Sequence, residues 1–358
     1  MVANKGLIFK QVPQGYPVPG QDLVVESREF NPDTPPAGGL SVKNHYLSFD
    51  PYQRGRMRAP DIKSYSAPFK LNEPITNRGI STVLKSDNPN FKAGDVIVST
   101  DSCPTAEYGY LDKEVTERAH VLDNPYKLDP KVFIGALGMP GLTAYSSFYD
   151  IGKPKKGETI FISAASGAVG QLVGQLAKHE GLKVIGSVGD DKKLDFILKD
   201  LGFDSGFNYK KEKPAAALAR LAPDGIDIYY ENVGGEQLEA AIDAMKAFGR
   251  IVACGMISQY NLLPTAENPT PAYPIRNLML IVARRITFRG FIVGDDNMGP
   301  VYAKEHRENV SKWIADGSFK AQMSTTEGID GAAEGFVGML QGKNFGKAVL
   351  EISPLKTS

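Results

Sequence analysis

Residues 159–254 alternate between short apolar runs and stretches with helical spacing, and this alternation limits the folds open to the chain. The apolar runs are Thr159–Ser163, Lys183–Ser187, Ile226–Tyr230 and Gly249–Cys254, and the helical stretches between them are Val169–His179, Lys192–Leu201 and Glu236–Met245. Strands that alternate with helices predict a parallel sheet with helices on both faces. Such a sheet binds its ligand at the carboxyl ends of its strands.

The remainder of the 358-residue chain has a different pattern, and its length suggests about two domains. Short apolar runs bounded by Pro, Gly and Asn turns predict strands at Asp22–Glu26, Leu40–Leu47, Ile80–Leu84 and Asp95–Ser99. Near the C-terminus, the helix candidate Val301–Ala315 is followed by the segments Phe319–Ser324 and Gly331–Leu340, and Ala348–Ile352 reads as a closing strand. We therefore predict an α/β protein with a mostly β domain over residues 1–135, a doubly wound domain over 136–317, and a return to the first domain over 318–358.

A turn of small residues joins the first strand of the alternating region to its helix. Aligned with the dinucleotide-binding pattern, Ser163–Gly170 reads A-x-G-x-x-G, with Ala165, Gly167 and Gly170 in the key positions. Gly167 lets the backbone approach a pyrophosphate, and the helix N-terminus favours negative charge. A small-residue turn without a ligand is the alternative, but the spacing of strand, turn, helix and next strand favours a nucleotide site.

The residues that follow the second predicted strand favour NADP over NAD. NAD sites place Asp or Glu at the tip of this strand, whereas here the strand ends Ile185–Gly189 without an acid. Lys192 and Lys193 follow, with Tyr209–Lys211 further on, and a 2′-phosphate needs cations and hydroxyl donors of this type. The alternative is that the lysines begin a solvated helix, and two acids, at positions 190 and 191, lie in the same loop.

The composition excludes several classes of protein. The formal net charge is zero, which gives no general attraction to nucleic acid or anionic lipid. No run approaches the roughly 18 apolar residues of a membrane span, and the first residues lack the apolar core of a signal peptide. Two cysteines cannot build a disulfide framework, so a reducing compartment fits. We expect a cytoplasmic protein that binds neither nucleic acid nor membranes.

The supply of metal ligands is small. The cysteines are Cys103 and Cys254, the histidines are His45, His120, His179 and His306, and none has C-x-x-C or H-x-x-x-H spacing. A catalytic zinc takes three protein ligands and a structural zinc takes four, so we expect no metal. No G-x-S-x-G nucleophile is present either. The chemistry that remains for a nicotinamide enzyme is hydride transfer assisted by a hydrogen-bond donor such as a tyrosine hydroxyl.

Six motifs occur in order over nearly the whole chain. They are Asp50–Tyr52 followed by Arg54 and Arg56, then Leu137–Tyr145, Ala164–Ala177, Tyr230–Gly235, Cys254–Asn261 and Gly342–Lys347. In these motifs the chain resembles the medium-chain dehydrogenase/reductase superfamily, in its zinc-independent branch of alkenal double-bond reductases and leukotriene B4 12-hydroxydehydrogenase/prostaglandin reductases. The resemblance implies a GroES-like, mostly β catalytic domain and a Rossmann domain that binds NADPH.

The resemblance also implies roles for individual residues. Tyr260 would hydrogen-bond the substrate carbonyl, with Tyr52 across the pocket, although with 15 tyrosines in the chain a packing role is the alternative for each. The cofactor-binding residues that it implies are Met139, Thr143, Ala165, Ser166, Gly167, Ala168, Val169, Gly189, Lys193, Tyr209, Asn232, Cys254, Gly255, Ile257, Ser258, Tyr260, Phe291, Ile292, Val293 and Asn344.

The implied reaction is NADPH-dependent reduction of the C=C bond of α,β-unsaturated aldehydes or ketones, with hydride transfer to the β-carbon and stabilisation of the enolate by tyrosine. Three alternatives stay open: a quinone reductase of the same superfamily, an oxidoreductase of hydroxylated lipids of the prostaglandin or leukotriene type, and an NADPH-binding protein without turnover. Gln53 departs from the hydrophobic residue usual within the D-P-Y-x-R motif. Pro60–Pro74 and Pro264–Pro274 are expected to be loops at the pocket edge.

One further segment bears on assembly. Arg285–Val293 has alternating apolar character and is predicted to form an edge strand. Edge strands of this superfamily commonly extend across a dimer interface, so the resemblance implies a homodimer. A buried strand of the same sheet is the alternative.

Overall fold

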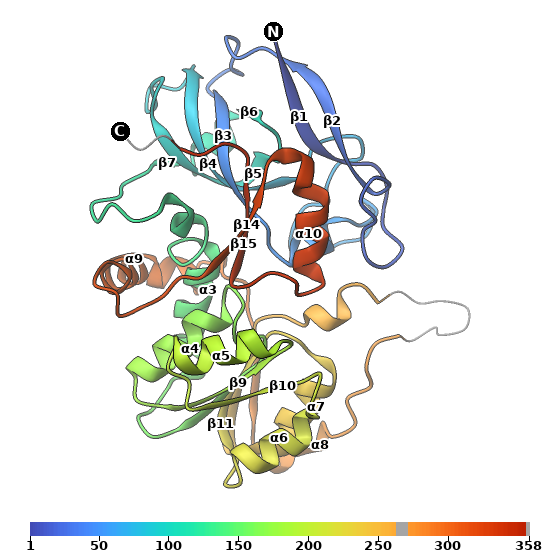
Figure 1. The fold of residues 1–358 in the computed structure, drawn as a ribbon, viewed down its shortest axis with the longest axis vertical. Coiled ribbons are helices and arrows are strands. Elements are labelled where there is room, and N and C mark those ends of the chain that lie inside the picture. The colour runs from blue at the N-terminus through green and yellow to red at the C-terminus, as the bar shows by residue number, and fades with distance from the viewer. Residues whose placement is uncertain (263–270, 356–358) are drawn as a thin grey trace. The chain divides into compact units, whose positions relative to one another are not determined.

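The computed structural model describes residues 1–262 and 271–355, which divide into two compact units. Unit 1 holds residues 1–134 and those from 323 onward, and unit 2 holds residues 135–322 (Figure 1). The sequence placed these boundaries after residues 135 and 317. The second boundary lies later because Gln175 Nε2 donates to Lys320 O at 2.9 Å and Gln171 Nε2 donates to Gln322 O at 3.0 Å. These bonds hold the connecting segment on unit 2.

Unit 2 is built on a parallel sheet, which among the described residues has six strands in the order β10-β9-β8-β11-β12-β13. The strands are β8 (Thr159–Ile162), β9 (Lys183–Val188), β10 (Ser205–Asn208), β11 (Ile226–Glu231), β12 (Met245–Ala253) and β13 (Thr287–Gly290). The chain runs outward from β8 in one direction and then from β11 in the other. The position between β8 and β11 is therefore the topological switch point at which such sheets bind ligands.

Helices cover this sheet on both faces, as the alternating sequence predicts. They are α3 (Met139–Ser147), α4 (Gly170–His179), α5 (Asp191–Lys199), α6 (Pro214–Leu221), α7 (Gly235–Ala244), α8 (Met279–Ala283) and α9 (Gly299–Ala315). The apolar side chains of α6 and α7 join Phe161, Ile185 and Tyr229 of the strands in one buried cluster. Phe161 stacks on Tyr229 with ring centroids 5.0 Å apart. The central strands β8 and β11 are largely apolar because both of their faces are buried.

Unit 1 is mostly β. Its larger sheet has the order β14-β15-β3-β4-β5-β7, with β6 paired to β3, and β1 and β2 form a separate antiparallel pair. The strands are β1 (Val2–Phe9), β2 (Leu23–Phe30), β3 (Leu40–Ser48), β4 (Thr76–Ser86), β5 (Val96–Pro104), β6 (Tyr108–Leu111), β7 (His120–Val121), β14 (Met323–Glu327) and β15 (Lys347–Glu351); the helices are α1 (Gln53–Arg56), α2 (Lys113–Thr116) and α10 (Ala332–Leu340). The predicted fold class, a mostly β unit and a doubly wound parallel-sheet unit, is confirmed.

The C-terminal segment completes unit 1 (Figure 1). Strand β15 pairs antiparallel with β3 and parallel with β14, and the apolar face of α10 joins the core of the unit. The predicted closing strand is therefore confirmed, and it lies between β14 and the first half of the chain. Because Val349 lies 301 positions after its partner Ser48 in sequence, only the folded chain brings the two strands together.

The structure describes the first of the two predicted loops and only part of the second. Residues 60–74 lie outside helices and strands, as expected for a loop, whereas residues 263–270 of the second predicted loop, Pro264–Pro274, fall outside the described residues.

The predicted edge strand is shorter than expected. Only Thr287–Gly290 forms β13, because these four residues are the ones that pair with β12.

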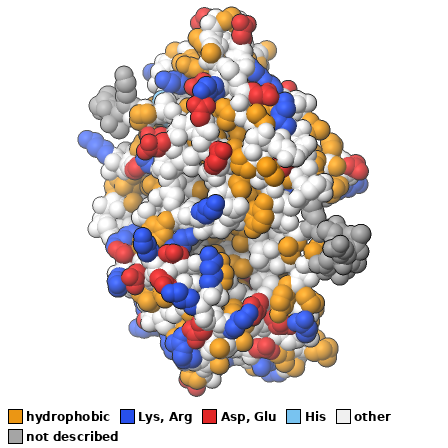
Figure 2. All heavy atoms as spheres, turned by 45° about the vertical axis from the view of Figure 1, so that its right-hand side comes forward, with side chains coloured by type: hydrophobic (Ala, Val, Ile, Leu, Met, Phe, Trp, Pro, Cys, Tyr) orange, Lys and Arg blue, Asp and Glu red, His pale blue; other side chains and the backbone are white. Residues whose placement is uncertain are grey.

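The surface carries charges of both signs. On the face drawn in Figure 2, acidic and basic side chains are interspersed, in keeping with the formal net charge of zero. Over the described ranges 1–262 and 271–355, the helices fall short of the length and apolar character that a bilayer crossing requires.

Gly141, in the first turn of α3, tests how tightly unit 2 is packed. A Cβ atom there would lie 1.7 Å from Ala136 O and 2.8 Å from His306 Nε2. We expect Gly141→Ala to lower the free energy of unfolding by about 3 kcal/mol, the scale of overpacking in a closed core. The measurement is urea denaturation. Gly55→Ala is the control, since a Cβ there meets nothing within 4 Å, and coincident curves for the two variants would contradict the account.

Candidate active site

The turn between β8 and α4 lies beside the switch point of the sheet. Ala164 has a left-handed backbone with φ of 48°, and Gly167 N–H donates to Ala164 O at 2.9 Å to close the turn. A Cβ at Gly170 would lie 2.4 Å from Ala164 O, so this glycine lets the helix approach the strand. A Cβ at Gly167 would meet only Ala164 O, at 3.1 Å, among the described atoms within 4 Å. The backbone at Gly167 is therefore open for a phosphate to approach.

The missing first glycine of the motif is compensated on the neighbouring strand. Ala165 is fully buried, and its N–H donates to Ser187 O of β9 at 3.0 Å. A Cβ at Gly186 would lie 2.8 Å from the methyl carbon of Ala165 and 2.7 Å from Ile197. The absence of a side chain at Gly186 thus provides the space that the methyl group of Ala165 takes up.

The loop after β9 gathers the side chains predicted to hold a 2′-phosphate. A Cβ at Gly189 would lie 2.8 Å from the hydroxyl of Tyr209, so the phenol packs directly over this glycine. Partial burial lowers the pKa of Lys193; the nearby Asp190 raises it and Lys210 lowers it further. The ammonium groups of Lys193 and Lys210 and the phenol of Tyr209 therefore share one region, where an added anion would relieve the repulsion between the two lysines.

The two acids of this loop already have partners. Asp190 is the N-cap of α5, and its carboxylate accepts the N–H of Lys192 at 2.9 Å. Asp191 accepts from Asn208 Nδ2 at 2.8 Å and forms a short ion pair with Lys211. Neither carboxylate stands at the end of β9 in the position that would bind ribose hydroxyls in an NAD site. The arrangement supports the predicted preference for NADP.

A buried polar network fixes Asn232 at the carboxyl end of β11. Asn232 donates from its backbone to Ser163 Oγ at 2.9 Å and from Nδ2 to Ser163 O at 2.7 Å. The fully buried carboxylate of Glu231 accepts the N–H groups of Val233 at 2.5 Å and Gly234 at 2.8 Å. Burial raises the pKa of the Glu231 carboxyl, and these backbone donors oppose the shift. The network sets the backbone of residues 231–234.

Tyr260 lies beyond the carboxyl end of β12. Its phenolic oxygen accepts the N–H of Met256 at 3.1 Å, and a Cβ at Gly255 would lie 2.8 Å from the same oxygen. Gly255 therefore makes room for the hydroxyl. A hydroxyl that accepts one hydrogen bond is polarised and becomes a better donor of its own proton. Tyr260 is consequently suited to donate to an oxygen that gains negative charge.

Other predicted residues of unit 2 support these segments. Thr143 Oγ1 donates to Met139 O at 2.8 Å within α3, and Ser258 Oγ donates to Val233 O at 2.6 Å. Burial raises the pKa of the Cys254 thiol to about 12, which keeps it protonated and unreactive. Val293 O accepts the N–H of Gly299 at 3.0 Å and so fixes the segment after β13.

The structure brings many of the predicted cofactor residues to one edge of the sheet. The residues that follow the carboxyl ends of strands are Ala165, Ser166, Gly167, Ala168 and Val169 after β8, Gly189 after β9, Tyr209 after β10, Asn232 after β11, Cys254, Gly255, Ile257, Ser258 and Tyr260 after β12, and Phe291, Ile292 and Val293 after β13. Carboxyl ends of parallel strands meet at the same edge, where α/β sheets bind ligands. Lys193 lies in α5, and Met139 and Thr143 lie in α3.

Two predicted residues lie in unit 1. Tyr52 donates its hydroxyl proton to Asp101 Oδ1 at 3.2 Å, and Asp101 pairs with Arg78 at 2.7 Å. Burial and then the charge of Asp101 raise the pKa of Tyr52 well above its usual value. Asn344 donates from Nδ2 to Gly346 O at 2.6 Å. The hydroxyl proton of Tyr52 is thus already donated to the Asp101 carboxylate, whereas a general acid must donate its proton to the substrate.

Several supporting residues escaped the sequence analysis. Ser163 and Glu231 end the apolar runs TIFIS and IDIYYE, where a polar residue closing a buried strand was the available signal. Gly186 and Asp101 gave no signal, because their importance depends on neighbours distant in sequence: Ala165 for the glycine and Tyr52 for the carboxylate.

The histidines have structural contacts. His306 is buried against Ala136 O at 2.9 Å, and burial lowers the pKa of its imidazole to about 4. His45 lies 2.8 Å from Thr82 Oγ1 and 3.0 Å from Ser353 O. Within residues 1–262 and 271–355, no three His, Cys, Asp or Glu side chains lie close enough together to hold a metal ion.

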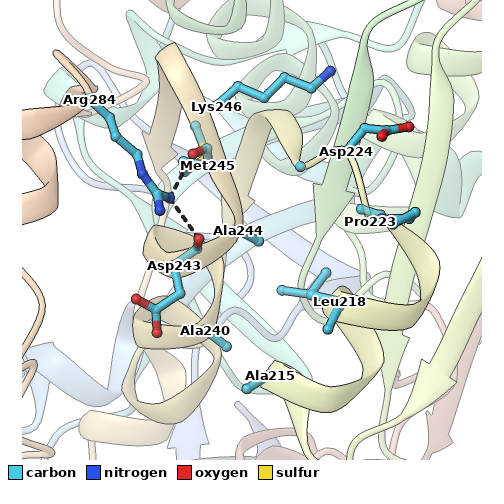
Figure 3. Close-up of a pocket in the computed structure, with 13 residues that line it drawn as sticks. Ala215, Leu218, Pro223, Asp224, Ala240, Asp243, Ala244, Met245, Lys246 and Arg284 are labelled. Atoms are coloured by element: carbon cyan, nitrogen blue, oxygen red, sulfur yellow. Dashed lines mark hydrogen bonds between the residues drawn. The ribbon is translucent and has the colours of Figure 1, made fainter.

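A groove between α6 and α7 is separate from the candidate site (Figure 3). It is lined by residues at the amino ends of β11 and β12, including Gly225 and Met245, and by small side chains of the two helices. Arg284 crosses one side of it and donates to the carbonyls of Ile242, Asp243 and Met245, which caps the end of α7. The groove lies at the edge of the sheet opposite to the predicted cofactor residues.

Comparison with known proteins gives the family. A model described as an N-terminal domain of oxidoreductase matches residues 5–116, and one described as a zinc-binding dehydrogenase matches residues 168–314. The chain is 55% identical over 357 residues to the NADP-dependent oxidoreductase RED1 of Cochliobolus heterostrophus, covering 99% of each chain. It is 41% identical to the NADP(+)-dependent 2-alkenal reductase of Nicotiana tabacum, covering 98% of each.

A solved structure agrees with these sequence matches. CurA of Vibrio vulnificus in complex with NADPH is 32% identical and superimposes with a TM-score of 0.85, over 98% of this chain and 100% of that chain. The chain therefore belongs to the medium-chain dehydrogenase/reductase superfamily and is an NADP-dependent oxidoreductase. The open backbone at Gly167 and the cationic region around Lys193 and Tyr209 fit NADPH, so the cofactor predicted from sequence is confirmed.

Lys193 provides a test of the phosphate site. We expect Lys193→Ala to weaken NADPH binding about tenfold or more, since a charge-assisted hydrogen bond contributes roughly 1.5–3 kcal/mol. Affinity for NADH, which lacks the 2′-phosphate, should change little. Fluorescence titration with both nucleotides measures the effect, and Lys199→Ala, in the last turn of α5, is the control. An equal loss for NADPH and NADH would contradict the assignment.

Proposed function

We propose that this enzyme reduces the C=C bond of α,β-unsaturated aldehydes and ketones with NADPH. The observation that carries the proposal is the hydroxyl of Tyr260, polarised by the N–H of Met256 at the ligand-binding edge of the sheet. Reduction of an enal or enone places negative charge on its carbonyl oxygen, and a preorganised donor stabilises such charge. The identity with a 2-alkenal reductase supports the same reaction.

In this proposal the chain holds the cofactor through the turn at Gly167, Lys193 and Tyr209 at the 2′-phosphate, and Asn232 and Asn344 elsewhere. Bound NADPH supplies a hydride to the β-carbon of the substrate. Tyr260 donates a hydrogen bond to the carbonyl oxygen and stabilises the enolate as it forms. The α-carbon then takes a proton from solvent or from a relay. No metal ion takes part in the proposed reaction.

Tyr52 has a different role from Tyr260 in this scheme. Its proton is held by Asp101 and its pKa is raised by burial, so it is a poor donor to an oxygen with developing charge. We propose that its ring shapes the substrate site and that its hydroxyl oxygen accepts hydrogen bonds. The two tyrosines are therefore expected to respond differently when the hydroxyl is removed.

Removal of the Tyr260 hydroxyl tests the mechanism. We expect Tyr260→Phe to lower kcat/KM for trans-2-hexenal roughly thirtyfold, since loss of one oxyanion donor costs on the order of 2–4 kcal/mol. NADPH affinity should stay within about twofold, because the phenol oxygen serves the substrate. Tyr52→Phe is the matched comparison, with an expected loss below about fivefold. A larger effect at Tyr52 than at Tyr260 would refute the assigned roles.

A substrate panel decides between this proposal and its alternatives. NADPH oxidation is followed with short enals, long enals, cyclic enones, phenylpropenals and quinones, and 15-hydroxy lipids are tested with NADP⁺. Quinone turnover without enal turnover would select the quinone reductase alternative, and no turnover at all would favour a nucleotide-binding protein. Rates that vanish with 1,10-phenanthroline and return with zinc would overturn the metal-free scheme.

We also propose that two copies pair along β13. This strand hydrogen bonds to β12 on one side and, in the described part of the chain, has no strand on the other. Apolar side chains are exposed beside it: Met279 at 75%, Val282 at 70% and Phe248 at 66%. The backbone of Phe248 bonds to Arg284 O just before the strand. An open strand edge next to exposed apolar groups favours association with a second copy.

Light scattering after size-exclusion chromatography measures the assembly. The wild type is expected to show twice the chain mass of 38.8 kDa. Val282→Glu should shift the mass toward a monomer, because a charge would be buried against apolar groups. Leu71→Glu, at an exposed position in unit 1, is the control and should leave the mass unchanged. A monomeric wild type would reject the proposal.

A further inference from the structure

Lys347 and Asp50 form a buried ion pair in unit 1. Nζ of Lys347 lies 3.0 Å from Asp50 Oδ1, and the two side chains are only 3% and 6% exposed. In the ion pair of Arg250 with Glu158 in unit 2, by comparison, each side chain is 16% exposed. Burial lowers the pKa of Lys347, while Asp50 opposes that shift. A charge buried to this degree is costly unless its partners are well placed.

The neighbours of the pair add further hydrogen bonds to it. Lys347 Nζ also donates to Phe49 O, and Ser48 Oγ donates to Asp50 Oδ2. The backbone N–H of Asp50 donates to Gln53 Oε1 at 2.8 Å. Gln53 is itself fully buried, and its amide donates to Thr76 O at 3.1 Å. Gln53, the polar residue that departs from the D-P-Y-x-R pattern, therefore belongs to this network and anchors it to β4.

The Lys347–Asp50 pair lies where two segments that carry predicted site residues leave the β15–β3 ladder. The β15–β3 ladder pairs Val349 with Ser48, and Phe49 N–H donates to Ala348 O at 3.2 Å. Tyr52 lies two residues after Asp50, and Asn344 lies three residues before Lys347. The ammonium of Lys347 spans the gap between the segments, because it bonds to both Phe49 and Asp50.

We propose that Lys347 is a positioning residue that holds the Tyr52 and Asn344 segments in one fixed arrangement through Asp50. An apolar pair of similar volume often gives a core equal stability, so stability alone does not require the charges. An ammonium, in contrast, has directional donors that admit one register of Phe49 O and Asp50 Oδ1. Both parts of this inference rest on the proposed function: one on the proposed substrate contact of Tyr52, the other on the proposed NADPH contact of Asn344.

Lys347→Met tests the inference at a temperature where circular dichroism shows the variant folded. We expect the Kd for NADPH to rise about tenfold through Asn344, and the KM for trans-2-hexenal to rise about fivefold through Tyr52, since small misplacements of a site are costly. Lys347→Arg keeps the charge and donors and should recover both constants to within about threefold of the wild type. A packing role alone predicts no such recovery, because arginine is the larger misfit in a closed core.

Arg250→Met is the matched control. It breaks the half-buried pair of Arg250 with Glu158 in unit 2, 2.6 Å apart. Arg250 also donates to the carbonyls of Gly152, Lys153 and Asp227, and these are not predicted site residues. It should lower thermal stability yet leave Kd and KM within about twofold of the wild type. If folded Lys347→Met kept both constants within about twofold, or if Arg250→Met changed them equally, the inference would fail.

The test remains decisive if other parts of the account fail. Should Lys347→Met not fold, Asp50→Asn has the same volume and is expected to change both constants in the same direction. If the wild type does not reduce enals, NADPH titration still tests the effect of Lys347 on the Asn344 segment, because this measurement needs no turnover. In that case an unchanged Kd in the lysine variant overturns the inference, and a raised Kd supports it independently of the substrate.

Discussion

The close approach of backbone segments at the carboxyl edge of the parallel sheet is the constraint on which the site depends. Gly170 lets α4 meet the turn after β8, and Gly186 leaves room for the methyl group of Ala165. Gly189 and Gly255 each lie directly beneath a tyrosine hydroxyl. A side chain at any of these positions would push apart the elements that carry the phosphate turn, the 2′-phosphate residues or Tyr260. The glycines therefore act through the space that they leave to their neighbours.

Buried polar groups then set the direction of the segments that the glycines bring together. In unit 2, Ser163 and Glu231 satisfy the backbone of residues 232–234 and hold the Asn232 side chain. In unit 1, Asp50 and Lys347 perform a comparable task for the turn before Tyr52. Each network has its hydrogen bonds supplied largely by backbone groups. Hydrogen bonds between buried side chains and the backbone favour one arrangement of these segments over its neighbours.

The two tyrosines show how local partners decide the chemistry of one residue type. Tyr260 accepts a backbone N–H, which strengthens its hydroxyl as a donor, whereas Tyr52 gives its proton to Asp101. Their motifs alone made both look like substrate-contacting hydroxyls. Because of these partners, Tyr260 is the expected hydrogen-bond donor to the substrate and Tyr52 an acceptor. The proposed mechanism follows from this difference.

The sequence by itself determined the parallel sheet, the A-x-G-x-x-G turn and the NADP preference, because these depend on periodicity and on residues close together in the chain. Tertiary structure alone decided the rest. Strand β10 has one large apolar residue, Phe207, and exists because it pairs with β9. Gln53 looked like a departure from its motif until the fold placed it between Asp50 and β4. Lys347 and Asp50 are 297 residues apart, so no local pattern links them, and only burial of both charges at one point of the sheet makes them a pair.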